Sequence, residues 1–562
     1  MDKRTGLPHV AYFCMEFGLH EELVIYAGGL GILAGDVLKA AHDLKMPMVG
    51  VGILWHHGYT AQHVDQEGKP YDTYPPLKME HMQDTGVVVH VQVGRENVAC
   101  RVWRLDAYGN APLYLLDTNI PGSPHGWITR SLYGGSEVDR VAQEIVLGIG
   151  GVRALRKLRI PVDIFHFNEG HAVLAGVELL RERMERGESF DTALRAVRSH
   201  ITFTTHTPVL AGNESHEHPF LQDIGAYNGL DFRQMCLLGG DPFGMTVAGL
   251  RLAQLANGVS KMHGVTAREM WSDVDRCAPV LAVTNGVHRP TWQDPRMGVA
   301  FEHHQDLWSV HAVARNELLV EVAARTGRCL NPDSLLIGFA RRAATYKRSD
   351  LILRRPDVIE PLLASGRISL IFSGKAHPHD ENGKKIVSAM YAAAHQYPSS
   401  VVYLENYDMY LAKRMVRGCD VWLNNPRRPL EASGTSGMKA AMNGVLNLSI
   451  LDGWWPEGCH DGVNGWQFGN GYQGPDQNER DLVDLYEKLM SEILPTFQDR
   501  KSWEKMMRAS IAMAQSRFCA ERMVMEYANL MYMPVFAIQD AEETLARCGV
   551  AYQEAYAEAM RR

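Results

Sequence analysis

The sequence predicts an α/β protein of two Rossmann-like, doubly wound domains, and three observations support this fold class. At 562 residues the chain is too long for one hydrophobic core and long enough for two large domains. Short apolar runs alternate with amphipathic stretches, which is typical of parallel sheets covered by helices. Glycines and charged residues follow several of these runs. We therefore expect ligands at the carboxyl ends of strands, in a central cleft that the two domains face.

The expected strands fall into two sets, one in each half of the chain. The first set comprises residues 10–13, 48–54, 113–117, 162–167, 201–206 and 280–286. The second set comprises residues 335–341, 368–374, 401–406, 420–425 and 445–451. Prolines and polar residues interrupt the alternation of apolar and amphipathic stretches at 287–300. The chain beyond about residue 480 is typical of helices alone. We expect an N-terminal domain over 1–295, a C-terminal domain over 296–520, and helices over 521–562 that pack back across both.

Composition argues against several classes of protein. The formal net charge of −8 does not suit a protein that coats nucleic acid or anionic membranes, because those tasks need a basic surface. The nine cysteines are scattered and form no Cys-x-x-Cys pair, which indicates free thiols in a reducing compartment. The first residues contain no signal peptide, and no apolar run reaches the roughly 18 residues of a membrane span. We expect a cytoplasmic enzyme.

Four cations lie within eight residues at the end of the expected strand 335–341, namely Arg341, Arg342, Lys347 and Arg348. Guanidinium and ammonium groups suit the oxygens of phosphate, so this cluster predicts a phosphate site. The alternative is the solvated start of a helix.

Two glycine motifs resemble nucleotide-binding loops without matching them. Lys375 follows an expected strand, but seven residues separate the glycines at 366 and 374, where four separate those of a P-loop. Ala376 also replaces the Ser or Thr that a P-loop requires. The stretch 28–34 lacks the preceding strand and the acidic residue of a dinucleotide fingerprint. It instead predicts a loop whose backbone N–H groups face a phosphate or a sugar.

The histidines do not have the spacing of a metal site, so no metal is expected. The clusters at 165–171 and 215–220 lack the helical His-Glu-x-x-His pattern, and no second cluster completes a tetrahedral set. His206 and His171 follow neighbouring expected strands. Each suits a hydrogen bond to a polar ligand or, alternatively, a satisfied place in the core.

One lysine occupies an unusual position in the stretch EASGTSGMKAAMNGVLNLSILDGWW, residues 431–455. Lys439 stands between a glycine-rich turn and an apolar run, where loss of solvent favours the uncharged amine. Such a lysine indicates either a structural anion or a covalent bond.

Several segments together resemble the α-glucan phosphorylase family, which contains the glycogen, starch and maltodextrin phosphorylases. The matching segments are Glu16-Phe17, Gly28–Gly31, Asn168–His171, Thr205–Thr207, Thr284–Gly286, Arg342–Arg348, Gly374–Ala376, Leu404–Tyr407 and Glu431–Lys439. The last segment is the most specific, because it resembles the one that carries the cofactor lysine in that family. The resemblance implies two domains in the glycosyltransferase B-type arrangement.

The resemblance also implies a hexosyltransferase reaction. Inorganic phosphate would cleave the terminal α-1,4 bond of glycogen or maltodextrin, with retention, to give α-D-glucose 1-phosphate. Pyridoxal 5′-phosphate would be bound covalently to Lys439, and its phosphate would relay the proton, since a phosphate with a second pKa near 6 exchanges protons at neutral pH. A homodimer is a further implication.

Roles for individual residues follow from the same resemblance. The cofactor phosphate would be held by the residues Thr435, Ser436, Lys347, Arg341 and Tyr407. The substrate phosphate would be held by Arg342 and Lys347 with the loop at Gly28 and Gly29. The glucosyl hydroxyls and the transition state would be held by the residues Glu431, Ser433, Gly434, Asn285 and His206.

The chain departs from the family pattern at a few points. It is much shorter than the animal and plant enzymes, so we expect no phosphorylation or nucleotide control of their kind. Ser436-Gly437 replaces the usual Gly-Asn pair, and Asp408 stands where long members carry Arg. Both changes affect residues of the expected cage around the cofactor phosphate.

Two rival functions remain open from the sequence. A nucleotide-sugar-dependent glycosyltransferase similar to glycogen or starch synthase would share the architecture, but it has no use for a covalent cofactor at Lys439. A glucan-binding protein without catalysis would share the sugar pocket and would not need the cations at 341–348. A bound pyridoxal chromophore and phosphate-dependent product release separate these alternatives.

Overall fold

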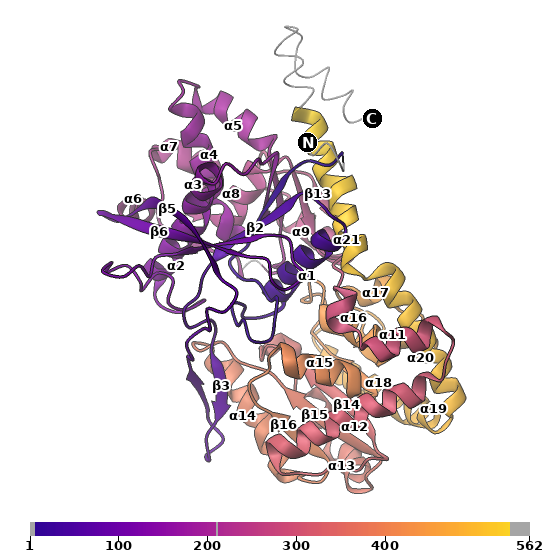
Figure 1. Ribbon diagram of the computed structural model, residues 1–562. Helices are drawn as coiled ribbons and strands as arrows, with labels where there is room; N and C mark the ends of the chain where they lie inside the picture. The colour runs from indigo at the N-terminus through magenta and orange to yellow at the C-terminus, as the bar shows by residue number, and fades with distance from the viewer. Residues whose placement is uncertain (1–5, 210–211, 540–562) are drawn as a thin grey trace. The chain divides into compact units, whose positions relative to one another are not determined.

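The computed structural model describes residues 6–209 and 212–539, and its chain divides into two compact units (Figure 1). The first unit contains the chain up to Tyr59, Pro76–Thr284 and the chain from Met523. The second unit contains Thr60–Pro75 and Asn285–Arg522. The expected division at 295 and 520 stays a prediction, and residues 540–562 of the helices expected over 521–562 lie outside the described residues.

The first unit is built on a nine-stranded sheet with the order β13-β12-β9-β8-β1-β2-β7-β6-β5 among the described residues. The strands from β13 to β7 are parallel, and β6 and β5 add an antiparallel hairpin. The strands are β1 (Val10–Phe13), β2 (Met48–Ile53), β5 (Gln83–Val93), β6 (Glu96–Leu105), β7 (Leu113–Asp117), β8 (Ile164–Asn168), β9 (Ile201–Thr204), β12 (Leu255–Gly258) and β13 (Val280–Ala282). The chain starts at the centre, runs to one side and returns to the other, so the strand order reverses between β1 and β8.

The second unit has a six-stranded parallel sheet with the order β16-β15-β14-β17-β18-β19 among the described residues. Its strands are β14 (Leu335–Ala340), β15 (Ile368–Ser373), β16 (Val401–Leu404), β17 (Val421–Asn424), β18 (Leu446–Ile450) and β19 (Gly465–Phe468). The strand order reverses between β14 and β17, as in doubly wound folds. The remaining strands form two short antiparallel pairs, namely the hairpin of β3 (Ala61–Val64) with β4 (Pro70–Thr73) in the second unit, and β10 (Ser215–His216) with β11 (Phe243–Gly244) in the first unit.

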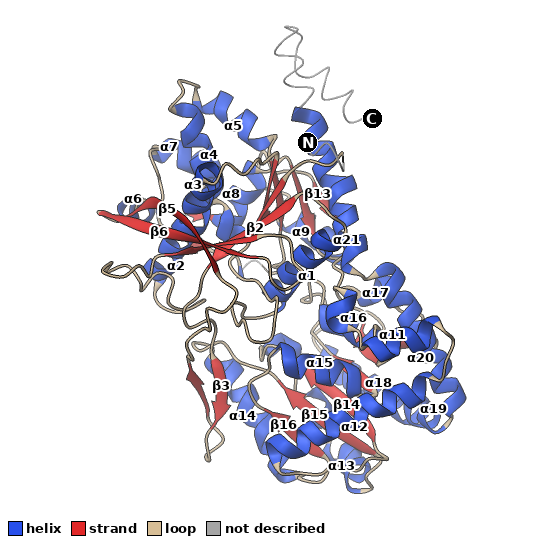
Figure 2. Cartoon of the chain, in the orientation of Figure 1, coloured by secondary structure: helices blue, strands red, loops and turns tan. Residues whose placement is uncertain are grey.

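Helices flank the strands in both units (Figure 2). Those of the first unit are α1 (Gly29–Asp43), α2 (Glu137–Ile145), α3 (Gly151–Lys157), α4 (Leu174–Met184), α5 (Phe190–Arg198), α6 (His218–Ile224), α7 (Phe232–Gly239), α8 (Met245–Leu252) and α9 (Lys261–Met270). Those of the second unit are α10 (Arg289–Trp292), α11 (Pro295–Glu302), α12 (Leu307–Thr326), α13 (Pro356–Ala364), α14 (Glu381–Gln396), α15 (Met409–Gly418), α16 (Thr435–Ala441), α17 (Trp455–Gly458), α18 (Gln477–Lys488), α19 (Leu494–Gln498) and α20 (Arg500–Arg517).

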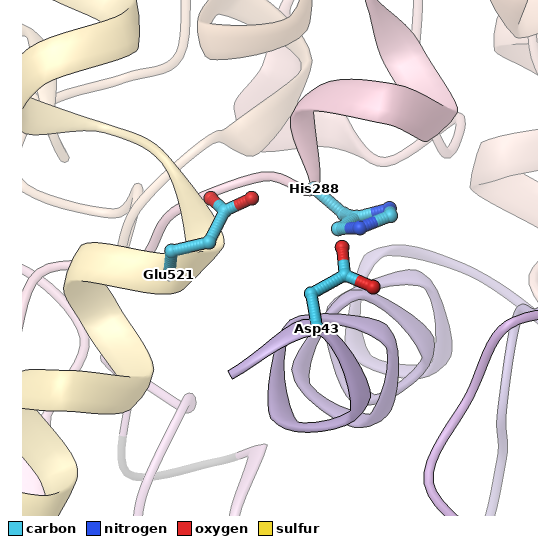
Figure 3. Close-up of side chains that lie close together, drawn as sticks. All are labelled: Asp43, His288 and Glu521. Atoms are coloured by element: carbon cyan, nitrogen blue, oxygen red, sulfur yellow. The ribbon is translucent and has the colours of Figure 1, made fainter. Parts of the chain in front are cut away.

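The chain passes from the second unit back to the first within α21 (Ala520–Tyr527). In the second unit, Glu521 lies in the first turn of this helix and His288 directly precedes α10, while Asp43 ends α1 of the first unit (Figure 3).

No helix in the described part of the chain is both long enough and apolar enough to cross a membrane.

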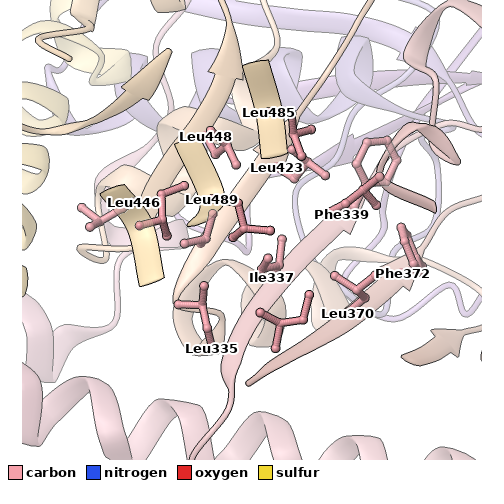
Figure 4. Close-up of a cluster of buried hydrophobic side chains, with 14 of the residues drawn as sticks. Leu335, Ile337, Phe339, Leu370, Phe372, Leu423, Leu446, Leu448, Leu485 and Leu489 are labelled. Carbon is pink, nitrogen blue, oxygen red and sulfur yellow. The ribbon is translucent and has the colours of Figure 1, made fainter. Parts of the chain in front are cut away.

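The core of the second unit shows why an apolar run becomes a parallel strand there. Leu335, Ile337 and Phe339 of β14 lie in one buried cluster with side chains of β15, β18 and α18 (Figure 4). The intervening Leu336 and Ala340 lie in a second buried cluster. Side chains therefore alternate between two covered faces, which requires an uninterrupted apolar sequence. Burying each large side chain contributes about 1.5–3 kcal/mol.

The prediction of a doubly wound α/β fold is confirmed. Every strand expected from an apolar run is present, most with ends within about two residues of those expected. The sequence did not reveal β12, β19 or the hairpins, because these strands are short, polar or alternate in polarity.

Candidate active site

The second unit brings the predicted cations to the carboxyl end of β14. Arg341 follows β14 directly, and Lys347 ends the short helical turn Thr345–Lys347. The buried carboxylate of Glu431 contacts both cations: its Oε2 accepts a hydrogen bond from Arg341 Nη1 at 2.5 Å and another from Lys347 Nζ. This cluster lies beside the point of strand reversal, where open α/β sheets bind ligands.

The two cations set the charge of Glu431. Burial works to raise the pKa of this carboxyl, but Lys347 and Arg341 offset it and lower the pKa to about 2. Glu431 is therefore ionised at neutral pH and is only a hydrogen-bond acceptor, which suits sugar hydroxyls as donors. The remaining N–H groups of the cations suit an oxyanion such as phosphate.

Helix α16 carries Lys439 and begins beside the cation cluster. Gly434 precedes the helix with φ 86°, and a Cβ there would lie 3.3 Å from Arg341 Nη2. Ser436 Oγ accepts a hydrogen bond from Arg341 Nη2 at 3.4 Å and from Trp422 Nε1 at 3.2 Å. The first N–H groups of a helix have no acceptor within it, so Thr435 and Ser436 offer backbone donors to an anion.

Gly437, the other unusual residue of this segment, is fixed by packing. A Cβ at Gly437 would lie 2.5 Å from Asn447 Oδ1 and 3.1 Å from the Trp454 ring. Asn447 Nδ2 also donates to the carbonyl of Gly437 at 3.0 Å. The replacement of Asn by Gly at this position therefore allows β18 and Trp454 to approach the helix closely.

Lys439 lies in the surroundings that its sequence position predicts. The residue is 7% exposed, and its Nζ is 3.7 Å from the centre of the Trp292 ring. Its carbonyl accepts a hydrogen bond from Asn443 Nδ2 at 2.9 Å. An aromatic face attracts an ammonium by its quadrupole and cannot accept its proton.

The residues of this region fit a cofactor that carries both a carbonyl and a phosphate. Arg341 Nε, Ser433 Oγ and Asn285 Oδ1 are buried and have no hydrogen-bond partner among the described residues. Buried polar atoms normally have partners, so these three atoms are available to a ligand. Lys439 supplies an amine for the carbonyl, and Arg341 with the start of α16 supplies donors for the phosphate.

The other cations of the motif have separate positions. Arg342 is exposed, which leaves its guanidinium accessible to solutes. Arg348 is buried and binds Asp481 at 2.8 Å and the carbonyl of Asn425 at 2.8 Å, so it joins the segments after β14 and β17. Arg341, Arg342 and Lys347 are the cations of the motif whose groups suit a phosphate.

Two residues after β16 complete the expected cage. Tyr407 is half-buried; burial raises the pKa of its hydroxyl, and the charge of Arg341 opposes this. Asp408 caps α15, because its Oδ1 accepts from the backbone N–H of Leu411 at 2.8 Å. The acid that departs from the family pattern therefore stabilises the start of a helix.

Asp452 was not found by the sequence reasoning, yet it supports Glu431 directly. Its Oδ2 accepts from the backbone N–H of Glu431 and its Oδ1 from that of Gly453, each at 2.9 Å. Burial, together with the charge of Glu431, raises the pKa of Asp452 to about 7. The available signal was a charged residue close after the buried strand β18, the same kind of signal that marked Arg341.

The first unit places a second polar cluster at its own point of strand reversal. Glu16 follows β1 and accepts hydrogen bonds from the backbone N–H groups of Ala27 at 2.6 Å and Gly28 at 3.2 Å, and from Tyr133 Oη at 2.8 Å. Burial raises the pKa of Glu16. No described atom lies within 4 Å of where a Cβ would stand at Gly28 or Gly29, so this side of the loop is open.

His206 lies in the same unit, at the end of β9. Its Nε2 is 2.7 Å from Asn168 Oδ1, and its backbone N–H donates to the buried carboxylate of Glu169. Burial lowers the pKa of His206 to about 3, so the ring is neutral. His171 follows β8, and burial likewise lowers its pKa to about 3. Glu169 has φ 74°, a conformation that costs about 1–3 kcal/mol in a residue with a side chain.

The predicted site residues therefore divide between the two units. The second unit contains Arg341, Arg342, Lys347, Tyr407, Glu431, Ser433, Gly434, Thr435, Ser436, Lys439 and Asn285. The first unit contains Gly28, Gly29 and His206. Asn285 is the first residue of its segment of the second unit, where its carbonyl accepts from Arg522 Nη2 at 2.9 Å.

Comparison with known proteins gives consistent matches. Residues 300–457 match the family model described as carbohydrate phosphorylase. A maltodextrin phosphorylase of Thermococcus litoralis is 38% identical over 94% of this chain and 71% of its own length. A glycogen phosphorylase of Mycobacterium tuberculosis is 39% identical over 93% of this chain and 71% of its own length. One of Aquifex aeolicus is 35% identical over 94% of this chain and 86% of its own length.

Proposed function

The chain belongs to the carbohydrate phosphorylase family, and from this premise we propose that it is an α-1,4-glucan phosphorylase. Inorganic phosphate cleaves the terminal glucosyl residue of glycogen or maltodextrin, with retention, and α-D-glucose 1-phosphate is released. The observation that carries the proposal is the convergence of Arg341, Lys347 and Glu431 beside the helix that holds the buried Lys439.

The residues around Lys439 suit pyridoxal 5′-phosphate as the cofactor. The Lys439 amine would hold its carbonyl group, and Arg341, Ser436 and Tyr407 would surround its phosphate. When bound, the cofactor supplies a phosphate whose second pKa near 6 lets it exchange protons at neutral pH. The backbone N–H groups of Thr435 and Ser436 add donors that carry no charge.

The chain's own residues then have separate tasks in the reaction. Arg342 and Lys347 bind the substrate phosphate and balance its charge. Glu431, ionised and supported by Asp452, accepts hydrogen bonds from the glucosyl hydroxyls, with Ser433, Gly434 and Asn285 beside it. Donors and acceptors that are fixed before the reaction stabilise the developing charge without reorganisation.

From the first unit, the proposal assigns ligand binding to neutral His206 and to the loop at Gly28 and Gly29. The uncharged imidazole exchanges hydrogen bonds with a hydroxyl and does not attract phosphate away from the cations. The open side of the glycine loop allows a ligand to approach the backbone. A cytoplasmic location and a homodimer belong to the same proposal and are checked by cell fractionation and light scattering.

The synthase-like alternative is not favoured. A nucleotide-sugar-dependent transferase does not use phosphate as an acceptor and has no role for the amine of Lys439. The curated relatives named above are phosphorylases over nearly the whole of this chain.

Product analysis tests the function. Purified protein is incubated with maltodextrin, with and without inorganic phosphate, and glucose 1-phosphate and free glucose are quantified. We expect glucose 1-phosphate only in the presence of phosphate, with the α anomer by NMR. Release of free glucose at the same rate without phosphate would contradict the proposal, and UDP-glucose-dependent chain extension would favour the synthase alternative.

A further inference from the structure

Lys375 and the hairpin β3–β4 form a buried polar cluster that has no task in the proposed reaction. The hairpin belongs to Thr60–Pro75, which is part of the second unit although both flanking segments belong to the first. Among the charged residues that follow strands, Lys375 resembled a P-loop lysine, and the sequence offered no use for it. The contacts of the second unit supply one.

Gln62 joins the hairpin to the loop after β15. Its Oε1 accepts from the backbone N–H of Ala376 at 2.8 Å, and its Nε2 donates to the carbonyl of Ala376 at 3.2 Å. Asp72 lies opposite Gln62 in the hairpin register and accepts from Gln62 Nε2 at 3.0 Å and from Thr60 Oγ1 at 2.6 Å. The amide of Gln62, only 2% exposed, is thus held in one orientation.

Lys375 makes the second connection between the hairpin and this loop. Its Nζ donates to the carbonyl of Thr60 at 3.0 Å and to Asn406 Oδ1 at 3.2 Å. Burial lowers the pKa of Lys375 to about 8, whereas the charges of Asp408 and Asp72 act to raise it. Lys375 is half-buried, and withdrawing an ammonium from water is costly unless its hydrogen bonds are made, so this one favours a single arrangement of its partners.

The loop at 374–376 is in turn packed against the residues that follow β14. The carbonyl of Lys375 accepts from the backbone N–H of Ala343 at 2.9 Å. A side chain at Gly374 would collide with the carbonyl oxygen of Arg341, and Tyr403 Oη donates to the Gly374 carbonyl at 2.7 Å. The hairpin therefore supports the backbone that carries Arg341 and Arg342 indirectly, through the loop at 374–376.

We propose that Gln62 and Lys375 are positioning residues for the phosphate substrate. The hairpin fixes the loop at 374–376, and this loop fixes the backbone from which Arg341 and Arg342 extend. The inference rests on the proposed function, because it assigns phosphate to these arginines. Small displacements of a binding group weaken its contacts steeply. The loop is bonded to Ala343, next to Arg342, so loss of the hairpin contacts acts first on the binding of the substrate phosphate.

Steady-state kinetics of the holoenzyme test this role. The variants are Gln62→Met and Lys375→Met, which keep side-chain length and remove the hydrogen bonds, and Lys69→Ala, an exposed residue of the same hairpin, is the matched control. We expect the KM for phosphate to rise about 3- to 10-fold in both Met variants, the usual effect of one or two lost hydrogen bonds. The KM for maltodextrin and the cofactor content should stay within about twofold of wild type, and Lys69→Ala should match wild type throughout.

The outcomes separate this inference from the function on which it rests. An unchanged KM for phosphate in both Met variants, or an equal rise in the KM for maltodextrin, would overturn the positioning role while the phosphorylase function stands. Wild-type protein whose product release does not depend on phosphate would overturn both. Asp72→Asn is the milder variant if either Met variant fails to fold, and it should raise the same KM by a smaller factor.

Discussion

Glu431 of the second unit and Glu16 of the first are both buried carboxylates at the carboxyl end of a parallel sheet, but their partners differ. Glu431 is bound by the cations of Lys347 and Arg341, and its pKa is lowered to about 2. Glu16 is bound by two backbone N–H groups and a tyrosine hydroxyl, and burial raises its pKa. Neutral hydrogen-bond donors do not offset the cost of removing the Glu16 carboxylate from water, whereas two cations do offset it for Glu431.

Because of this difference, the two regions suit different groups of a ligand. The second unit holds an excess of positive charge around one carboxylate and suits phosphate groups. The first unit holds neutral donors, acceptors and the uncharged ring of His206, which suit hydroxyl groups. Variants in the charged region should therefore have the larger effects.

The largest effect is expected from Lys439→Ala. The variant should lose the pyridoxal absorption and at least about 10³-fold of the phosphorolytic activity, because no other amine replaces the one that holds the cofactor. The absorption spectrum and glucose 1-phosphate release are measured together, with the exposed Lys505→Ala as the control. Retention of bound cofactor by Lys439→Ala would refute the assignment.

The next largest effect is the difference between Glu431→Gln and Glu16→Gln in the free energy of unfolding. The first change leaves two buried cations without their carboxylate, which costs about 3–5 kcal/mol of the free energy of unfolding. The second keeps an oxygen for the backbone donors and removes a charge that burial already disfavours, so its cost should be about 1 kcal/mol or less. Urea denaturation of both variants measures the difference. Equal losses would mean that the two carboxylates are held in the same way.

Arg342→Ala should act on phosphate alone. We expect the KM for phosphate to rise about 10- to 100-fold, because a charge-assisted hydrogen bond contributes about 1.5–3 kcal/mol. Cofactor content should be unchanged, since Arg342 is exposed and Arg341 remains. Arg355→Ala, an exposed arginine outside the site, is the control. Normal phosphate kinetics in Arg342→Ala would remove this residue from the substrate site.

The stability of the two regions should depend on pH with opposite signs. The pKa of Glu431 falls from 4.5 to about 2 on folding, so its stabilisation is present above pH 4.5 and is lost as the pH falls toward 2, about 3 kcal/mol in total. The raised pKa of Glu16 means that protonation favours the folded state, so its contribution increases as the pH falls. Unfolding at pH 5 and pH 3 should show a flatter pH dependence for Glu431→Gln than for wild type. The contribution of Glu16 changes above pH 4.5, so unfolding at pH 7 and pH 4.5 should show a smaller gain of stability on acidification for Glu16→Gln than for wild type. The reverse order would contradict the assigned directions.

The smallest effect concerns His206, where the prediction is an absence of titration. A pKa near 3 means that the NMR shifts of its ring carbons and nitrogens should stay constant between pH 5 and pH 8. A His206 midpoint near 6.5 would mean that the ring is solvated and available as a cation.

The sequence predicted those parts of the molecule that depend on local pattern. Apolar runs located β14 and its neighbours because both faces of the sheet are covered, and the isolation of Lys439 in a glycine-rich turn indicated its special environment. The resemblance to a family then assigned residues that no local pattern distinguishes, such as Asn285.

Long-range contacts account for what the sequence did not predict. Arg348 looked equivalent to Arg341, but it pairs with Asp481 of α18 and donates to the carbonyl of Asn425 after β17, both far along the chain. Asp452 gave no signal of its support for Glu431, because that hydrogen bond depends on the neighbouring positions of β17 and β18. The hairpin β3–β4 was missed for its polarity, and its contact with Ala376 spans more than half the chain.

The most direct test of the central claim is to locate the cofactor on the chain. The purified protein is reduced with borohydride, digested and examined by mass spectrometry. The account predicts a pyridoxyl phosphate group on Lys439 at close to one per chain, and none on the buried Lys347 after β14 or on the half-buried Lys375 after β15. A label on Lys375 or elsewhere, or a protein that carries no label while releasing glucose 1-phosphate, would contradict it.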